Sequence, residues 1–115
     1  MADTAIKLAD ALVPGVGAPL YALHIAEEIW RNIHESRVLC ESVHVRLEKL
    51  WHKLEAMEET DTTPHGFNLT EFTDIVARFH ALVIKQTTKS LVVRVGTAAT
   101  FVTKLRRCHE DIDHV

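Results

Sequence analysis

The sequence predicts an all-α protein, an antiparallel four-helix bundle with a short extra helix at its N-terminus. Apolar residues recur at intervals of three and four over most of the chain, which is the spacing of an amphipathic helix. Only four glycines and three prolines interrupt the 115 residues, too few turn residues for an all-β protein. A hydrophobic content of 47% is enough to fill one core, so we expect residues 1–115 to form a single domain.

The longest apolar stripe runs through the first two predicted helices. A continuous helix from Pro19 to Glu58 would be about 60 Å long, whereas a compact domain of this size has a radius of gyration of about 13 Å. We therefore predict a break at Asn32, which would cap a second helix with Glu35 as its reciprocal partner. The two helices are then 19–31 and 32–58. Their common stripe consists of Ala22, Ala26, Ile29, Ile33, Cys40, Val43, Leu47, Leu50, Leu54 and Met57.

A turn-rich segment, residues 60–66, separates this stripe from a third predicted helix at 68–87. We predict that Asn68 caps this helix and that Glu71 completes the capping box. The predicted buried face of the third helix consists of Phe72, Ile75, Val76, Phe79, Leu82 and Val83.

The last third of the chain is less regular. Segment 91–95 is rich in β-branched residues, but it has no second strand to pair with, so we interpret it as a short helical turn ended by Gly96. A last main helix follows at about 97–114, and the short extra helix lies at about 4–13. Short connections favour antiparallel neighbours in such a bundle. The face of the last helix consists of Val102, Leu105, either Cys108 or His109, and Ile112.

The sequence offers little for catalysis or metal binding. No two of the eight histidines are three or four residues apart, which is the spacing of metal ligands on one helical face. Gly15 and Gly17 lack the further glycine and the preceding strand of a phosphate-binding loop. Cys40 falls in the apolar stripe, where a small buried residue is the simplest interpretation. We therefore expect no enzyme activity, no metal and no cofactor.

Cysteine usage and hydropathy indicate the compartment. Two cysteines form no disulfide framework, which favours a reducing environment. Residues 11–26 carry no Asp, Glu, Lys or Arg, but prolines and glycines interrupt them and they are too short to cross a bilayer as a helix. We expect the chain to be cytoplasmic and to bind membranes by recruitment to the plasma membrane.

Charge is distributed unevenly along the chain. Residues 1–74 hold 13 acidic and 6 basic residues, whereas residues 75–109 hold seven basic residues and no acidic one. The basic span either neutralises the acidic helix around Glu41, Glu48, Glu55 and Glu58 or binds an anionic partner, such as phosphorylated lipid headgroups. Nucleic acid is disfavoured, because the span lacks aromatic stacking residues outside the expected core. The candidate lipid-binding residues are Lys85, Lys89, Arg94, Lys104, Arg106 and Arg107.

Two stretches resemble a known family. Residues 32–40, followed by Val45-Arg46-Leu47, look like the second helix of HeLo-like four-helix domains, and residues 105–113 resemble their last helix. The Val13-Pro14-Gly15 start ahead of an apolar helix also fits. Such domains occur in the mixed-lineage kinase-domain-like pseudokinase and in related tyrosine-kinase-like kinases of fungi, oomycetes and plants.

The resemblance implies a regulatory or executioner bundle. In that family the domain self-associates, and in several members it binds anionic phospholipids and damages membranes during regulated cell death. A kinase or pseudokinase domain usually follows and controls it. Our first hypothesis is therefore a signalling bundle that self-associates and binds anionic lipids such as phosphoinositides. The alternative is an adaptor bundle that binds protein partners and no membrane. Trp30 and Trp51 are expected to be partly buried in either case.

Overall fold

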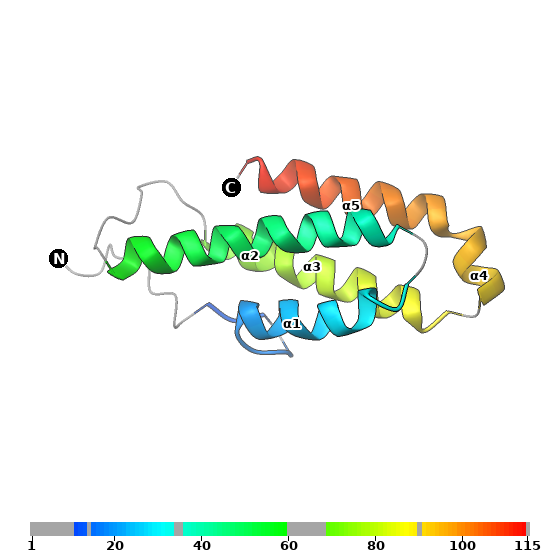
Figure 1. Ribbon diagram of the computed structural model, residues 1–115, viewed down its shortest axis with the longest axis horizontal. Helices are drawn as coiled ribbons and strands as arrows, with labels where there is room; N and C mark the ends of the chain where they lie inside the picture. Colours follow the sequence, from blue (N-terminus) through cyan, green and yellow to red (C-terminus); the bar gives the residue numbers. More distant parts are fainter. Residues whose placement is uncertain (1–10, 14, 34–35, 60–68, 90, 115) are drawn as a thin grey trace.

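The computed structural model describes residues 11–13, 15–33, 36–59, 69–89 and 91–114 (Figure 1). The described residues form no strand, and the all-α prediction is confirmed. The helical interpretation of residues 91–95 is confirmed as well, because they belong to a helix that ends at Gly96. The helices are α1 (Pro19–Trp30), α2 (Arg37–Glu59), α3 (Leu69–Thr87), α4 (Leu91–Gly96) and α5 (Ala98–Ile112).

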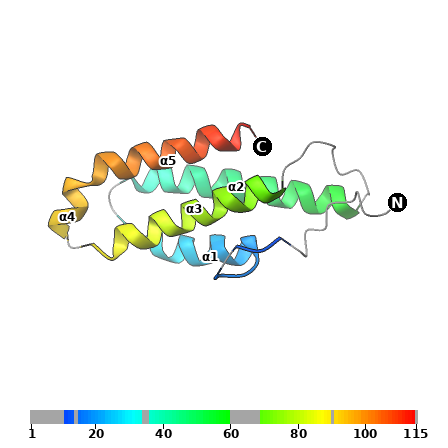
Figure 2. The same ribbon diagram turned by 180° about the vertical axis from the view of Figure 1, so that it is seen from behind.

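The four longer helices pack around one core. Helix α1 lies against α2 and α3, and α5 lies against the same two helices, so α2 and α3 occupy one diagonal of the bundle. Figures 1 and 2 show that α1 and α3 run in one direction and that α2 and α5 run in the other. The neighbours α1/α2 and α3/α5 are therefore antiparallel, whereas α1/α3 and α2/α5 are parallel. Across the diagonal, the rings of Trp51 and Phe72 stack with their centroids 5.9 Å apart.

The core takes one stripe from each of these helices, as helical periodicity requires. Both tryptophans are more deeply buried than expected, since Trp30 is 3% and Trp51 is 7% exposed. The face predicted for the third helix is correct except for Leu82, which is only half-buried. The principal core side chains are Ala22, Leu23, Ala26, Trp30, Cys40, Val43, Leu47, Trp51, Leu54, Phe72, Ile75, Val76, Phe79, Val83, Phe101, Leu105, Cys108 and Ile112.

The helix break near Asn32 is confirmed, but the predicted N-cap and start of the second helix are wrong. Helix α1 ends at Trp30 and α2 begins only at Arg37. Asn32 closes the first helix rather than opening the second, because its Nδ2 donates a hydrogen bond to the carbonyl oxygen of Glu28 at 3.0 Å. Ser36 takes the N-cap position of α2, since its carbonyl accepts the hydrogen bond from the Cys40 amide at 2.9 Å. Glu35, the predicted partner of the cap, lies outside the described residues.

The N-terminal prediction is tested only in part. Most of the predicted helix at 4–13 lies outside the described residues, and residues 11–13 are not helical. Instead, the backbone amides of Val16 and Gly17 both donate to the carbonyl of Val13, which forms a tight turn ahead of α1. Gly15 and Gly17 have φ values of 78° and 123°, which favour glycine at both positions.

Two further predictions concern the start of α3 and the buried face of α5. The predicted cap Asn68 lies outside the described residues, and α3 begins at the next residue. On α5 the buried alternative is Cys108, whereas His109 is half-buried at the edge. Phe101 fills the core position predicted for Val102. In the part of the chain that is described, no helix is long and apolar enough to cross a bilayer.

Candidate functional site

A groove of about 490 Å³ lies between α3 and α5. The two helices lie side by side on the face seen in Figure 2. Each helix contributes residues three or four positions apart, which places them on one edge of its buried stripe. The lining residues are Arg78, Ala81, Leu82 and Lys85 from α3, and Thr103, Lys104, Arg107 and Cys108 from α5.

The cations around this groove differ in their partners. Arg78 donates to Asp111 of α5 at 2.6 Å and to Asp74 of its own helix at 3.1 Å, so carboxylates compensate its charge. Lys85, Lys104 and Arg107 form no ion pair with any described residue. The groove therefore combines an apolar floor with three positive charges that lack an acidic partner in the described chain.

A smaller hollow of about 60 Å³ continues the groove toward the start of α5. It shares Leu82, Lys85 and Lys104 with the larger one and adds Lys89, Thr97 and Thr100, among others. The Lys89 ammonium donates to the Thr97 hydroxyl at 3.3 Å. Lys89 thus extends the row of cations along the α3–α5 face.

The other two predicted lipid-binding residues line neither hollow. Arg94 lies on α4, and its carbonyl accepts a hydrogen bond at 3.4 Å from Gln86, a buried residue of α3. Arg106 is exposed. It precedes His109 by three residues, and His109 contacts Arg46 of α2, so Arg106 lies on the flank of α5 that faces α2. Lys85, Lys104 and Arg107 are therefore the predicted residues that the fold brings together, with Lys89 beside them. The sequence prediction missed Arg78 and the apolar floor, although Arg78, Leu82 and Lys85 already share helical spacing.

Two acidic residues of α2, Glu48 and Glu55, lie close to histidines rather than to cations of the basic span. The buried His44 places its Nε2 3.5 Å from Glu48 and 3.6 Å from Glu27 of α1. Glu55 pairs with His52 at 2.9 Å. The ion pairs of the basic span with described carboxylates include those of Arg78 with Asp74 and with Asp111. This arrangement leaves the cations of the α3–α5 face available to another partner.

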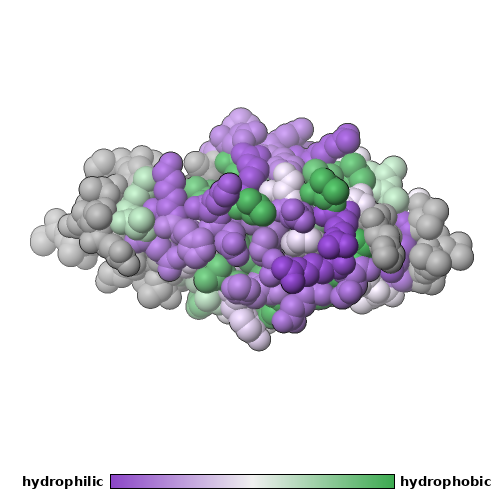
Figure 3. All heavy atoms as spheres, viewed as in Figure 1, coloured by the Kyte–Doolittle hydropathy of each residue, from purple (hydrophilic) through white to green (hydrophobic). Residues whose placement is uncertain are grey.

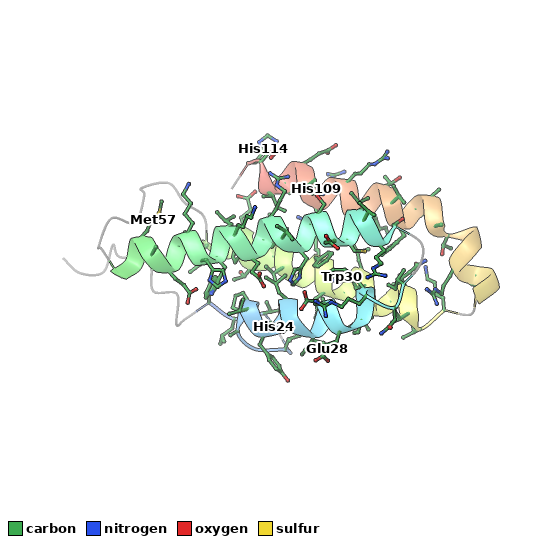
Figure 4. The ribbon with its side chains drawn as sticks, viewed as in Figure 1. His24, Glu28, Trp30, Met57, His109 and His114 are labelled. Atoms are coloured by element: carbon green, nitrogen blue, oxygen red, sulfur yellow. The ribbon has the colours of Figure 1, made fainter. Side chains whose placement is uncertain are left out.

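A second polar cluster joins the end of α5 to α2. Arg46 donates through Nη1 to the carbonyl oxygen of His109 at 3.1 Å and lies 3.0 Å from its Nδ1, and its Nη2 contacts Asp113. Because a guanidinium can only donate, Nδ1 of His109 must accept and the neutral ring carries its proton on Nε2. Figure 4 shows His109 on the side of α5 that faces α2. Burial lowers the pKa of His109, and the charge of Arg46 lowers it further.

We expect the stability of the bundle to fall as the pH decreases below about 6.5, the ordinary pKa of histidine. A histidine whose pKa is lowered on folding is protonated more readily in the unfolded chain, so acid favours unfolding. Urea denaturation between pH 7.5 and 5 should show a smaller decrease for His109→Gln than for the native chain. The remaining slope should include His80, whose pKa burial also lowers. An unchanged slope in the variant would contradict this assignment.

The described residues include no group of three or more His, Cys, Asp or Glu that could hold a metal ion. Histidines that could be metal ligands lie on different helices: His24 lies on α1, and His109 lies near the end of α5 (Figure 4). Both cysteines are buried and free of disulfides. Burial raises the pKa of the Cys108 thiol, which keeps it protonated and weakly nucleophilic.

Comparison with known proteins gives no match to a protein-family model, to a curated protein or to a solved structure.

Proposed function

We propose that this chain is a non-catalytic signalling bundle that binds anionic membrane lipids through the α3–α5 face. The observation that carries the proposal is the position of Lys85, Lys104 and Arg107 around one groove, without an acidic partner in the described chain. A basic residue near an anionic leaflet contributes about 1 kcal/mol to binding. Three such residues contribute about 3 kcal/mol, a factor of roughly 150 in affinity.

The opposite face of the molecule is suited to solvent. The view in Figure 3, with α2 in front, is hydrophilic over most of its area, with separate small hydrophobic groups. Its charged side chains include local pairs such as Arg31 with Glu27 at 3.2 Å. Arg37, Lys49 and Lys53 of α2 also form no ion pair with a described residue, but acidic residues such as Glu41 and Glu48 lie among them in the chain, whereas residues 75–109 contain no acidic residue. We therefore orient the α3–α5 face toward the membrane.

The resemblance to HeLo-like domains extends this proposal. By that resemblance the bundle self-associates and acts in cell-death execution or in the regulation of a kinase or pseudokinase domain. Phosphoinositides of the plasma membrane are then the anionic lipids, and the chain is cytoplasmic until it is recruited. The alternative function is a protein-binding adaptor, in which α3 and α5 dock an acidic partner and no membrane is bound.

Vesicle co-sedimentation tests the proposal with a matched pair of variants. Reversing Lys85, Lys104 and Arg107 to Glu should abolish binding to vesicles that contain phosphoinositides. Reversing Arg37, Lys49 and Lys53 to Glu changes the net charge equally on the exposed side of α2 and should weaken binding far less. Circular dichroism should show that both variants remain helical. Equal losses would mean that net charge governs binding, and a native chain that ignores anionic vesicles at low salt would favour the adaptor.

A further inference from the structure

We propose that the α3–α5 groove is a binding site for a single anionic phospholipid molecule of the membrane, which inserts part of one acyl chain between the two helices. This inference rests on the proposed function, but it asks more of the groove than surface attraction does. Attraction between a basic face and an anionic leaflet requires exposed cations only, and a flat face would serve. Here the cations surround a hollow of about 490 Å³.

The groove has two chemically different ends. Helices α3 and α5 are antiparallel, so Lys85 lies across from Lys104 at one end, and Arg78 lies across from Asp111 at the other. The first end carries uncompensated positive charge and continues into the small hollow. The second end is closed by an ion pair whose charges are already balanced. A negatively charged headgroup is therefore favoured at the Lys85–Lys104 end, where Arg107 follows Lys104 by about one turn of α5.

The headgroup end also provides further hydrogen-bond donors. The small hollow is lined by Thr100, which has a hydroxyl, and by Lys89, whose ammonium has three N–H groups and uses one of them on the Thr97 hydroxyl at 3.3 Å. The Thr97 hydroxyl itself donates to the carbonyl oxygen of Val93 at 2.8 Å. A phosphate monoester carries a charge of about −1.5 to −2, whereas a carboxylate carries −1. The Lys85, Lys89 and Lys104 ammoniums at this end therefore favour a phosphate over a carboxylate.

The floor between the two ends is apolar. Leu82 is half-buried, Ala81 is exposed, and the buried Cys108 also lines the groove. A soluble anion such as inorganic phosphate gains nothing from covering these side chains. An acyl chain does, because each methylene group that leaves water stabilises the complex by about 0.8 kcal/mol. A phosphate-binding end next to an apolar channel therefore favours an amphiphilic ligand over a soluble anion.

Titration calorimetry with short-chain lipids below their micellar concentration tests this site. Dihexanoyl phosphatidic acid should bind with a stoichiometry of one, and it should bind at least tenfold more tightly than inorganic phosphate. Dihexanoyl phosphatidylcholine, whose headgroup has no net charge, should bind at least tenfold more weakly than the phosphatidic acid. Each further methylene that enters the groove should tighten binding about fourfold. Phosphatidic acid that binds no more tightly than inorganic phosphate would overturn the inference.

A groove-filling variant separates insertion from surface attraction. Ala81 is exposed and lines the groove, so Ala81→Trp fills the channel, leaves every charge in place and avoids the core. It should weaken binding of dihexanoyl phosphatidic acid at least tenfold and remove the dependence on chain length. Ala99→Trp places the same side chain at an exposed position of α5 that lines neither hollow, and it should bind like the native chain.

The two proposals fail in different ways. If the native chain sediments with anionic vesicles but short-chain lipids bind no better than phosphate, the site for a single lipid is wrong and the proposed function stands. The same conclusion follows if Ala81→Trp leaves short-chain binding unchanged. If the native chain ignores anionic vesicles at low salt, the proposed function is wrong and the inference falls with it.

Discussion

Replacing Leu47 with alanine should lower the free energy of unfolding by about 2–5 kcal/mol. Leu47 is 0% exposed and lies in the middle of α2, where the loss of its methyl groups leaves a cavity that the surrounding helices cannot close. Denaturation in urea, followed by circular dichroism, measures the loss. The matched variant is Leu50→Ala, which removes the same atoms from a half-buried position of the same stripe and should cost less than half as much. Equal losses would mean that the two leucines share one environment.

That contrast marks the limit of what the apolar stripe could predict. Spacing by threes and fours groups Leu47 with Leu50 and excludes Trp51, yet Trp51 is buried and Leu50 is half-buried. A straight helix drifts by about 20° in each heptad relative to a strict 3.5-residue repeat, so the stripe moves off the buried face. In addition, α2 packs against both α1 and α5, and its buried face is wider than one stripe. Period alone predicts that a helix is amphipathic, but its neighbours decide which edge is covered.

The helix break shows a different limit. A compact domain cannot contain a 40-residue helix, and that argument correctly predicted an interruption between Pro19 and Glu58. It could not choose the capping residue, because Asn and Ser are both favoured at helix N-termini and Asn can also accompany the end of a helix. In the structure Asn32 bonds back to Glu28 and Ser36 precedes α2. Ile33, which follows α1 in the chain, is 1% exposed, so this connection is held by tertiary contacts that a local pattern does not contain.

The sequence also predicted one part of the candidate site and missed another. Helical spacing placed Lys104 and Arg107 on nearly one face of the last helix, and both line the groove. Spacing could not show that Arg106, the adjacent residue, lies on the α2 side. Nor could it show that Arg78 is neutralised by Asp111, 33 residues away in the chain. Which cations remain without a partner is a property of the α3–α5 packing, and a local pattern does not contain it.

Neutralising the cations of the groove should weaken binding to anionic vesicles in steps. Each of Lys85→Gln, Lys104→Gln and Arg107→Gln should reduce the partition coefficient about fivefold, and the triple variant should reduce it roughly 150-fold, because each basic residue contributes about 1 kcal/mol. Glutamine keeps the length of the polar side chain without adding repulsion, so the series measures lost attraction alone. Vesicle co-sedimentation over a range of lipid concentrations gives the partition coefficients.

The sharpest comparison in this series is between two adjacent arginines. Arg106→Gln and Arg107→Gln remove the same charge from the same helix, but only Arg107 lines the groove. If the α3–α5 face meets the membrane, Arg107→Gln should cost about fivefold and Arg106→Gln less than twofold. The difference between them should shrink as salt is raised, since charges near a surface are screened over about 8–10 Å at physiological ionic strength. Two equal losses would place the membrane against the whole outer surface of α5, and a larger loss for Arg106→Gln would place it against the α2–α5 side.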